Sequence, residues 1–92
     1  MLSESNKKLP NTVLAINIRR DGKAAGFLPD FNITVYGEDI VDVIAQAQLK
    51  GAALYYYNLE RDVVITLKAT YQEALSHCKT KNSFVTYISL TP

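Results

Sequence analysis

His77 and Cys78 are the residues of this sequence that could form a cysteine nucleophile with an imidazole base, since the chain has one cysteine and one histidine. Thiol catalysis needs an imidazole that faces the sulfur atom. Adjacent residues of a helix point about 100° apart, so these two side chains would diverge. We interpret Cys78 as a small buried apolar residue and His77 as a solvated surface residue.

Carboxylates could instead hold a catalytic metal, which would need three or four acidic groups at the ends of strands. The expected strands offer few, because Asp21 falls in a turn and Asp30 stands alone. The other acidic residues that could suggest metal or acid-base chemistry lie at the two ends of one expected helix: Glu38, Asp39, Asp42, Glu60 and Asp62. The four glycines are too scattered for a P-loop or dinucleotide fingerprint. We predict no catalytic residue, no cofactor and no metal, and therefore a protein that is not an enzyme.

Length and composition limit the class of protein. The chain has 92 residues, enough for one domain, and 48% are hydrophobic, which is typical of a folded protein. The net charge of +1 gives no whole-domain reason to expect nucleic acid binding, although it allows a local basic patch. The amino-terminal residues are polar and no apolar run approaches the ~20 residues that span a bilayer, so we expect a cytoplasmic protein without a membrane segment.

The first half of the chain predicts three strands. Residues 12–20 alternate between apolar and other side chains, which is typical of a strand with one buried face. Asp21-Gly22 predicts a hairpin turn into a second strand over residues 23–28, whose small residues around Gly26 indicate a close approach by another element. Pro29 ends this strand, and a third follows over residues 33–36, closed by Gly37.

A long helix is predicted over residues 39–58, with Asp39 as the N-cap and Asp42 in its first turn. Its expected buried stripe consists of Ile40, Ile44, Ala47, Gly51 and Leu54. Residues 63–67 could form a short strand or an extended link. Thr70 and Glu73 form a capping box for a second helix over residues 70–79, and residues 84–90 alternate as a last strand.

These elements give an α+β fold with the order β-β-β-α-(α)-β. We expect residues 1–11 to be a flexible lead-in and residues 12–92 to form a single domain. The expected architecture is an antiparallel three-stranded meander with the helices on one face, extended by the last strand.

Two surface features remain after the elements are placed. Tyr55, Tyr56 and Tyr57 point in three directions on a helix, so one should be exposed or covered by another chain. Tyrosine is favoured at interfaces, and packing beneath residues 60–82 is the alternative that we weigh equally. Arg19-Arg20 and Lys23 form a small basic hairpin tip that Asp21 dilutes, and we interpret it as a solvated turn.

The segment from Phe27 to Asp39 resembles the HicB family of small antitoxins. In that family the second strand ends in a Pro-Asp pair, as the second strand does here with Pro29-Asp30. A Gly followed by an acidic residue then precedes a capped helix, as Gly37-Glu38 does here, with Asp39 and Asp42 in the cap roles. The resemblance covers about residues 12–59 and 83–90. It implies a HicB-like domain over residues 12–92 in which Pro29, Asp30, Gly37 and Asp39 are mainly structural.

The resemblance implies a non-catalytic protein that binds and silences a small RNA-cleaving, HicA-like toxin. Many members of the family also repress their own operon through a separate C-terminal DNA-binding module. This sequence stops two residues after its last expected strand, so we expect no autonomous DNA binding. The alternative is a small α+β regulatory module of unknown ligand, and in either case we expect a homo-oligomer, formed through an edge strand or the Tyr55–Tyr57 surface.

Overall fold

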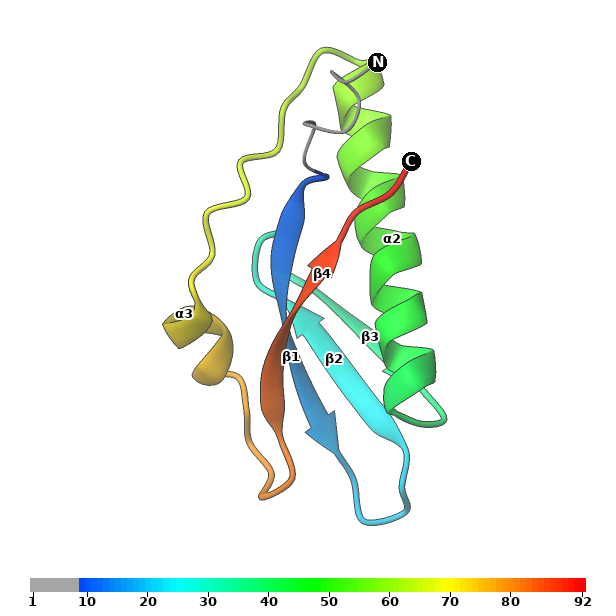
Figure 1. Cartoon of the computed structure of the whole chain (residues 1–92), viewed down its shortest axis with the longest axis vertical. Coiled ribbons are helices and arrows are strands. Elements are labelled where there is room, and N and C mark those ends of the chain that lie inside the picture. Colours follow the sequence, from blue (N-terminus) through cyan, green and yellow to red (C-terminus); the bar gives the residue numbers. More distant parts are fainter. Residues whose placement is uncertain (1–8) are drawn as a thin grey trace, which may run out of the picture.

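A four-stranded antiparallel sheet carries a long helix on one face in the computed structural model, which describes residues 9–92 (Figure 1). The sheet order is β3-β2-β1-β4. The elements, in chain order, are β1 (Asn11–Ile18), β2 (Ala24–Leu28), β3 (Ile33–Gly37), α2 (Ile40–Glu60), α3 (Tyr71–Leu75) and β4 (Phe84–Ser89). The predicted α+β fold and the meander extended by the last strand are therefore confirmed.

The amino-terminal lead-in was expected over residues 1–11. Residues 1–8 lie outside the described residues, and Asn11 already belongs to β1, where it pairs with Ser89 of β4. The predicted turn at Asp21-Gly22 is confirmed. The Gly22 N–H donates to the carbonyl of Arg19 at 3.0 Å, and Gly22 has a φ of +87°, a conformation that favours glycine.

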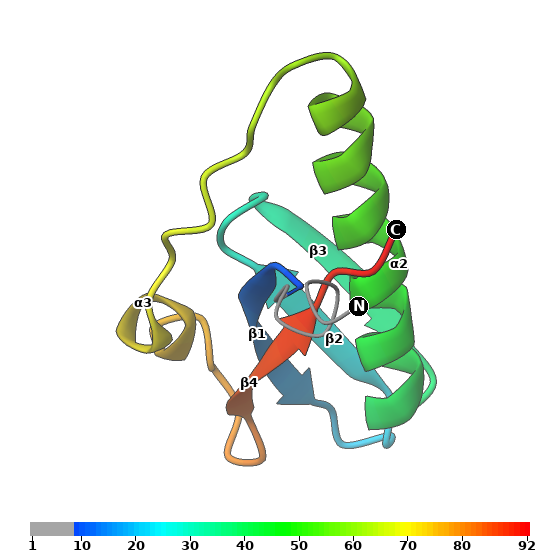
Figure 2. The same cartoon turned by 45° about the horizontal axis from the view of Figure 1, so that its top comes forward.

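The expectation that β1 buries only one face is wrong, because both faces are covered. Leu14 and Ile16 pack in the main core beneath α2, whereas Val13 and Ala15 pack with Ala74 of α3 in a second cluster. Figures 1 and 2 show α2 and α3 on opposite sides of the sheet. The expectation that both helices lie on one face of the sheet is therefore wrong. Helix α2 covers one face, and α3 covers the other, where Val13 and Ala15 would otherwise be exposed to solvent.

Helix α2 begins as predicted. The carboxylate of Asp39 accepts from the Asp42 N–H at 2.8 Å, and Asp42 accepts from the Glu38 N–H at 2.9 Å. Its fully buried residues are Val43, Ala47, Gly51 and Ala52. The predicted stripe is thus right at Ala47 and Gly51 and wrong at Leu54, which is 37% exposed. Leu54 lines a shallow hollow beside Ile33 and Thr34 of β3, so this edge strand of the sheet covers it only in part.

Close packing of α2 on the sheet explains the small residues of β2. A Cβ atom added at Gly26 would lie 2.8 Å from Cγ1 of Val43 and 2.9 Å from Cδ1 of Leu14. Real Cβ atoms do not approach other heavy atoms so closely. The predicted close approach at Gly26 is confirmed, and the approaching element is the first half of α2.

The chain between α2 and β4 is largely irregular. Residues 63–67 form an extended link and no strand. The second helix has its predicted cap, since Thr70 accepts from the Glu73 N–H at 3.1 Å, but it ends at Leu75 and not near residue 79. His77 is half-buried, with its ring centroid 4.2 Å from that of Phe27, so the expected solvated position is wrong. Cys78 is half-buried against the cluster that contains Ala74.

Candidate protein-binding surface

Asp30 ties the segment after α2 to the sheet. Its Oδ2 atom accepts from the hydroxyl of Thr12 at 2.6 Å, and its Oδ1 atom accepts from the backbone N–H groups of Lys68 and Ala69, each at 2.8 Å. Asp30 thus contacts residues almost forty positions later in the chain and is not confined to the turn after Pro29.

Asn17 makes a second tie that the sequence did not indicate. Its amide nitrogen donates to the carbonyl of His77 at 3.0 Å, and its Oδ1 atom accepts from the N–H groups of Lys79 at 2.6 Å and Thr80 at 3.3 Å. The only signal in the sequence was an amide side chain near the end of a strand rich in β-branched residues. Asp30 and Asn17 together hold both ends of the segment that covers the second face of the sheet.

Gly37 and Asp39 position the start of α2. A Cβ atom at Gly37 would lie 2.7 Å from the backbone nitrogen of Val43, so the chain can enter the helix this closely only with glycine there. In the β2–β3 pairing Gly37 lies opposite Ala24, while the Pro29-Asp30 pair follows the far end of β2. Pro29 and Asp30 therefore lie at one end of β2, and Gly37 and Asp39 lie at the other. The four residues do not converge on one site.

The three tyrosines of α2 have different surroundings. Tyr55 and Tyr56 are half-buried against the main core, and their rings meet edge to face with centroids 5.0 Å apart. Tyr57 is 56% exposed, and its hydroxyl accepts from the Arg61 guanidinium at 2.8 Å. Of the three, Tyr57 is the residue available to another chain.

Tyr56 closes a gap that Pro10 leaves in the sheet. The Leu90 N–H donates to the Pro10 carbonyl at 2.8 Å, as the next step of the β1–β4 ladder. Proline has no N–H to return the bond. The Tyr56 hydroxyl donates to the Leu90 carbonyl instead, at 2.7 Å, and this contact joins α2 to the end of the sheet.

A hollow of about 650 Å³ lies between the outer face of α2 and the residues after β4. We call it the α2 groove, and its lining is mostly apolar: Ala45, Gln48, Leu49, Ala52, Ala53, Tyr56, Tyr57, Glu60, Thr91 and Pro92. Leu49 is 66% exposed, so two large side chains, Leu49 and Tyr57, stand open to solvent beside a floor of alanines. An exposed apolar surface with a polar margin is typical of an interaction site.

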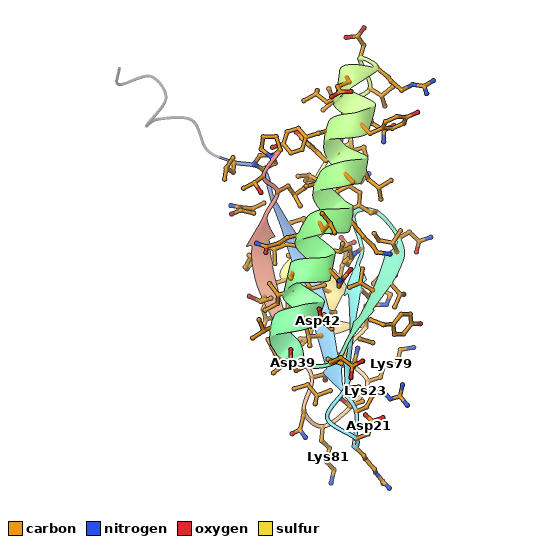
Figure 3. The ribbon with its side chains drawn as sticks, turned by 90° about the vertical axis from the view of Figure 1, so that its right-hand side faces the viewer. Asp21, Lys23, Asp39, Asp42, Lys79 and Lys81 are labelled. Atoms are coloured by element: carbon orange, nitrogen blue, oxygen red, sulfur yellow. The ribbon has the colours of Figure 1, made fainter. Side chains whose placement is uncertain are left out.

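Helix α2 and its ends carry an excess of negative charge. Of the nine acidic residues of the chain, five lie on α2 or directly beside its ends: Glu38, Asp39, Asp42, Glu60 and Asp62. The same stretch has two basic residues, Lys50 and Arg61. Glu60 lines the α2 groove, whereas Asp39 and Asp42 lie at the start of the helix (Figure 3). The α2 groove is therefore an apolar surface with one acidic residue at its margin, on a helix whose net charge is negative.

Residues 9–92 contain no group of three or more His, Cys, Asp or Glu side chains that could hold a metal ion. Within the same residues, no helix has the length and apolar character needed to cross a membrane. No family model, no curated protein and no solved structure matches the chain.

Proposed function

We propose that this chain is a non-catalytic protein that binds and neutralises a small RNA-cleaving toxin, in the manner of HicB-type antitoxins. The element order and the Pro29-Asp30 and Gly37–Asp39 segments support the proposal, since these are the features that carry the resemblance. Pro29-Asp30 follows the end of β2, and Gly37–Asp39 leads into the start of α2.

The observation that carries the proposal is the exposed apolar groove on α2, a helix with a net negative charge. A protein that cleaves RNA binds a polyanion and so presents a basic surface. The negative charge of α2, including Glu60 in the groove itself, complements such a surface, and a partner held there has its RNA-binding face covered. Charge complementarity of this kind also speeds association of the two proteins.

Leu49 and Tyr57 are the anchors of the proposed contact. A stable interface covers roughly 800 Å² per partner, and a few buried aromatic or aliphatic side chains supply most of its binding energy. These two side chains are already exposed, and both line the α2 groove beside alanines of the same helix. A toxin would bury them without rearrangement of the main core.

Co-purification with the product of a neighbouring gene tests the proposal. We expect recovery of a small ribonuclease whose activity this chain suppresses, and the double variant L49A/Y57A should bind it at least ~30-fold more weakly. Y36A is the matched control, because Tyr36 is a comparably exposed residue on β3, away from the groove. Recovery of no ribonuclease would refute the antitoxin role, and unchanged binding by L49A/Y57A would refute the assignment of the surface.

The proposal also specifies where the protein works. A ribonuclease toxin acts on cellular RNA, so its antitoxin belongs in the cytoplasm.

A homodimeric interaction module is the second candidate, and the outer edge of β4 favours it. The Leu90–Pro10 bond fixes the alternation of the ladder, so the backbone groups of Val85, Tyr87 and Ser89 point away from β1. No residue of β4 is charged, and Tyr87 is 61% exposed. Unprotected edges of this kind pair with other strands.

Light scattering coupled to size-exclusion chromatography at several concentrations tests this candidate. We expect a dimer that the Y87K variant converts to a monomer, because a lysine on the edge opposes strand pairing. A strict monomer at every concentration would exclude the dimer and leave the toxin-binding proposal untouched.

A further inference from the structure

Two turns that are distant in sequence lie together at one end of the sheet. β1 pairs with both β2 and β4, so the turn over residues 19–23 lies beside the turn over residues 79–83 (Figures 1 and 2). Between them is a hollow of about 470 Å³, which we call the turn hollow, lined by Ile18, Arg19, Arg20, Thr80, Lys81 and Asn82. The basic tip that the sequence indicated is thus only half of a larger feature.

Basic side chains gather at the turn hollow. Arg19, Arg20 and Lys81 line the turn hollow, and no acidic residue does. Lys23 and Lys79 lie at the same end of the molecule (Figure 3). Five of the ten basic residues of the chain therefore belong to these two turns.

The acidic residues at this end of the molecule do not line the turn hollow, and each contacts a partner of its own. Asp21 accepts from the Lys23 N–H at 3.0 Å, and its carboxylate lies 3.6 Å from the Arg19 guanidinium. Glu38 lies 4.0 Å from the Lys23 ammonium group. Asp39 and Asp42 accept bonds at the start of α2, so none of these carboxylates occupies the turn hollow.

The hollow also offers uncharged hydrogen-bond donors. The Ser83 N–H donates to the Thr80 carbonyl at 3.3 Å, which makes Lys81 and Asn82 the middle residues of a turn. Their own N–H groups, and that of Arg20 in the other turn, donate to no acceptor among residues 9–92. The Thr80 hydroxyl and Asn82 amide are further donors. Unpaired turn N–H groups next to guanidinium groups are what a phosphate group needs, since its oxygens accept several bonds at once.

We propose that the turn hollow binds a phosphate group, with Arg20 and Lys81 supplying most of the charge, because Asp21 pairs with Arg19, and with the two turns supplying neutral donors. A volume of about 470 Å³ exceeds that of phosphate alone and has room for an attached sugar. The phosphate group can come from inorganic phosphate, a nucleotide or an RNA backbone. The site is separate from the α2 groove, so it does not depend on the toxin-binding proposal.

Titration of the ¹⁵N-labelled full chain with inorganic phosphate, with 5′-AMP and with a short single-stranded RNA tests the proposal. We expect the amide signals of Arg20, Lys81 and Asn82 to shift with at least one of the three probes. Binding of phosphate and 5′-AMP would identify a small-molecule site, and binding of the RNA alone would identify the backbone of a nucleic acid as the source. The absence of shifts in both turns with all three probes at millimolar concentration would overturn the proposal.

Paired charge variants separate a site from general attraction. R20A/K81A should weaken binding at least about tenfold, whereas K50A/K68A, which loses the same charge elsewhere, should change it less than about twofold. Equal weakening by both variants would mean attraction by net charge only and would also overturn the proposal. The substituted residues are exposed, and the dispersion of the amide spectrum reports whether each variant is folded.

Discussion

The hydroxyl group of Thr12, which is 2% exposed, donates to the carboxylate of Asp30 at 2.6 Å. These residues lie opposite one another where β1 begins and β2 has just ended. The same carboxylate accepts from Lys68 and Ala69, so one side chain joins two strands and the segment leading into α3. This arrangement gives Asp30 a structural role that is testable without any knowledge of a partner.

We expect D30A to lower the free energy of unfolding by about 2–3 kcal/mol, because three donors lose a charged acceptor at once. D30N keeps one acceptor oxygen and should cost less. Urea denaturation followed by circular dichroism measures both. D62N is the matched control, since Asp62 is exposed and its left-handed backbone, with a φ of +61°, tolerates asparagine. Equal stability of D30A and D62N would show that the hydrogen bonds of Asp30 to Thr12, Lys68 and Ala69 do not stabilise the fold.

Asn17 should hold the carboxyl-terminal end of the segment over residues 68–80 against the sheet. In N17A the Lys79 and Thr80 N–H groups lose their acceptor, and we expect their hydrogen exchange to accelerate about tenfold or more as the segment opens locally. N17D retains an acceptor for these groups but places a carboxylate oxygen against the His77 carbonyl, so it should restore protection only in part. Unchanged exchange in N17A would show that the packing of α3 alone holds the segment.

Alanine substitutions at Gly26 and Gly22 should both destabilise the fold, but for different reasons. G26A should destabilise the fold by about 1–3 kcal/mol, because its Cβ atom would overlap the side chains of Val43 and Leu14 in the core. G22A meets no atom within 4 Å, so its cost of about 1 kcal/mol comes from the positive φ alone. Thermal unfolding measures both. The second variant G26A/V43A should recover part of the loss if overlap is the cause.

The tyrosines of α2 offer a comparison within one helix turn. Y56F removes the hydroxyl that satisfies the Leu90 carbonyl and should cost about 1 kcal/mol. Y57F removes an exposed hydroxyl and should change stability by less than about 0.5 kcal/mol. Chemical denaturation under identical conditions measures the difference. A cost for Y57F as large as that for Y56F would contradict the assignment of Tyr56 as the partner of Leu90.

Local patterns in the sequence predicted the elements well. The turn at Asp21-Gly22 and the caps at Asp39 and Thr70 depend on residues within four positions of each other, and all three are confirmed. The length of the second helix was overestimated. An apolar spacing continues through Cys78, but Asn17 accepts from the Lys79 and Thr80 N–H groups and holds that backbone against the sheet.

Features that depend on distant residues were not predictable in the same way. Alternation in β1 indicated one buried face. The second face is buried too, because Val13 and Ala15 are covered by Ala74, which lies about sixty residues later and which no local pattern connects to β1. The turn hollow likewise combines Arg20 with Lys81, which become neighbours only through the pairing of β1 with β4. The tyrosine cluster was predicted to divide between core and surface, and the structure identifies Tyr57 as the exposed member.

The position of β4 has a consequence for how the chain is made. β1 is a central strand whose two neighbours are β2, which follows it at once, and β4, which is the last strand of the chain. During synthesis the outer edge of β1 therefore stays open until residues 84–89 leave the ribosome. Nascent chains that stall before this point present an unpaired apolar strand, which is a template for aggregation. Synthesis of β4, and not that of the early meander, closes the sheet.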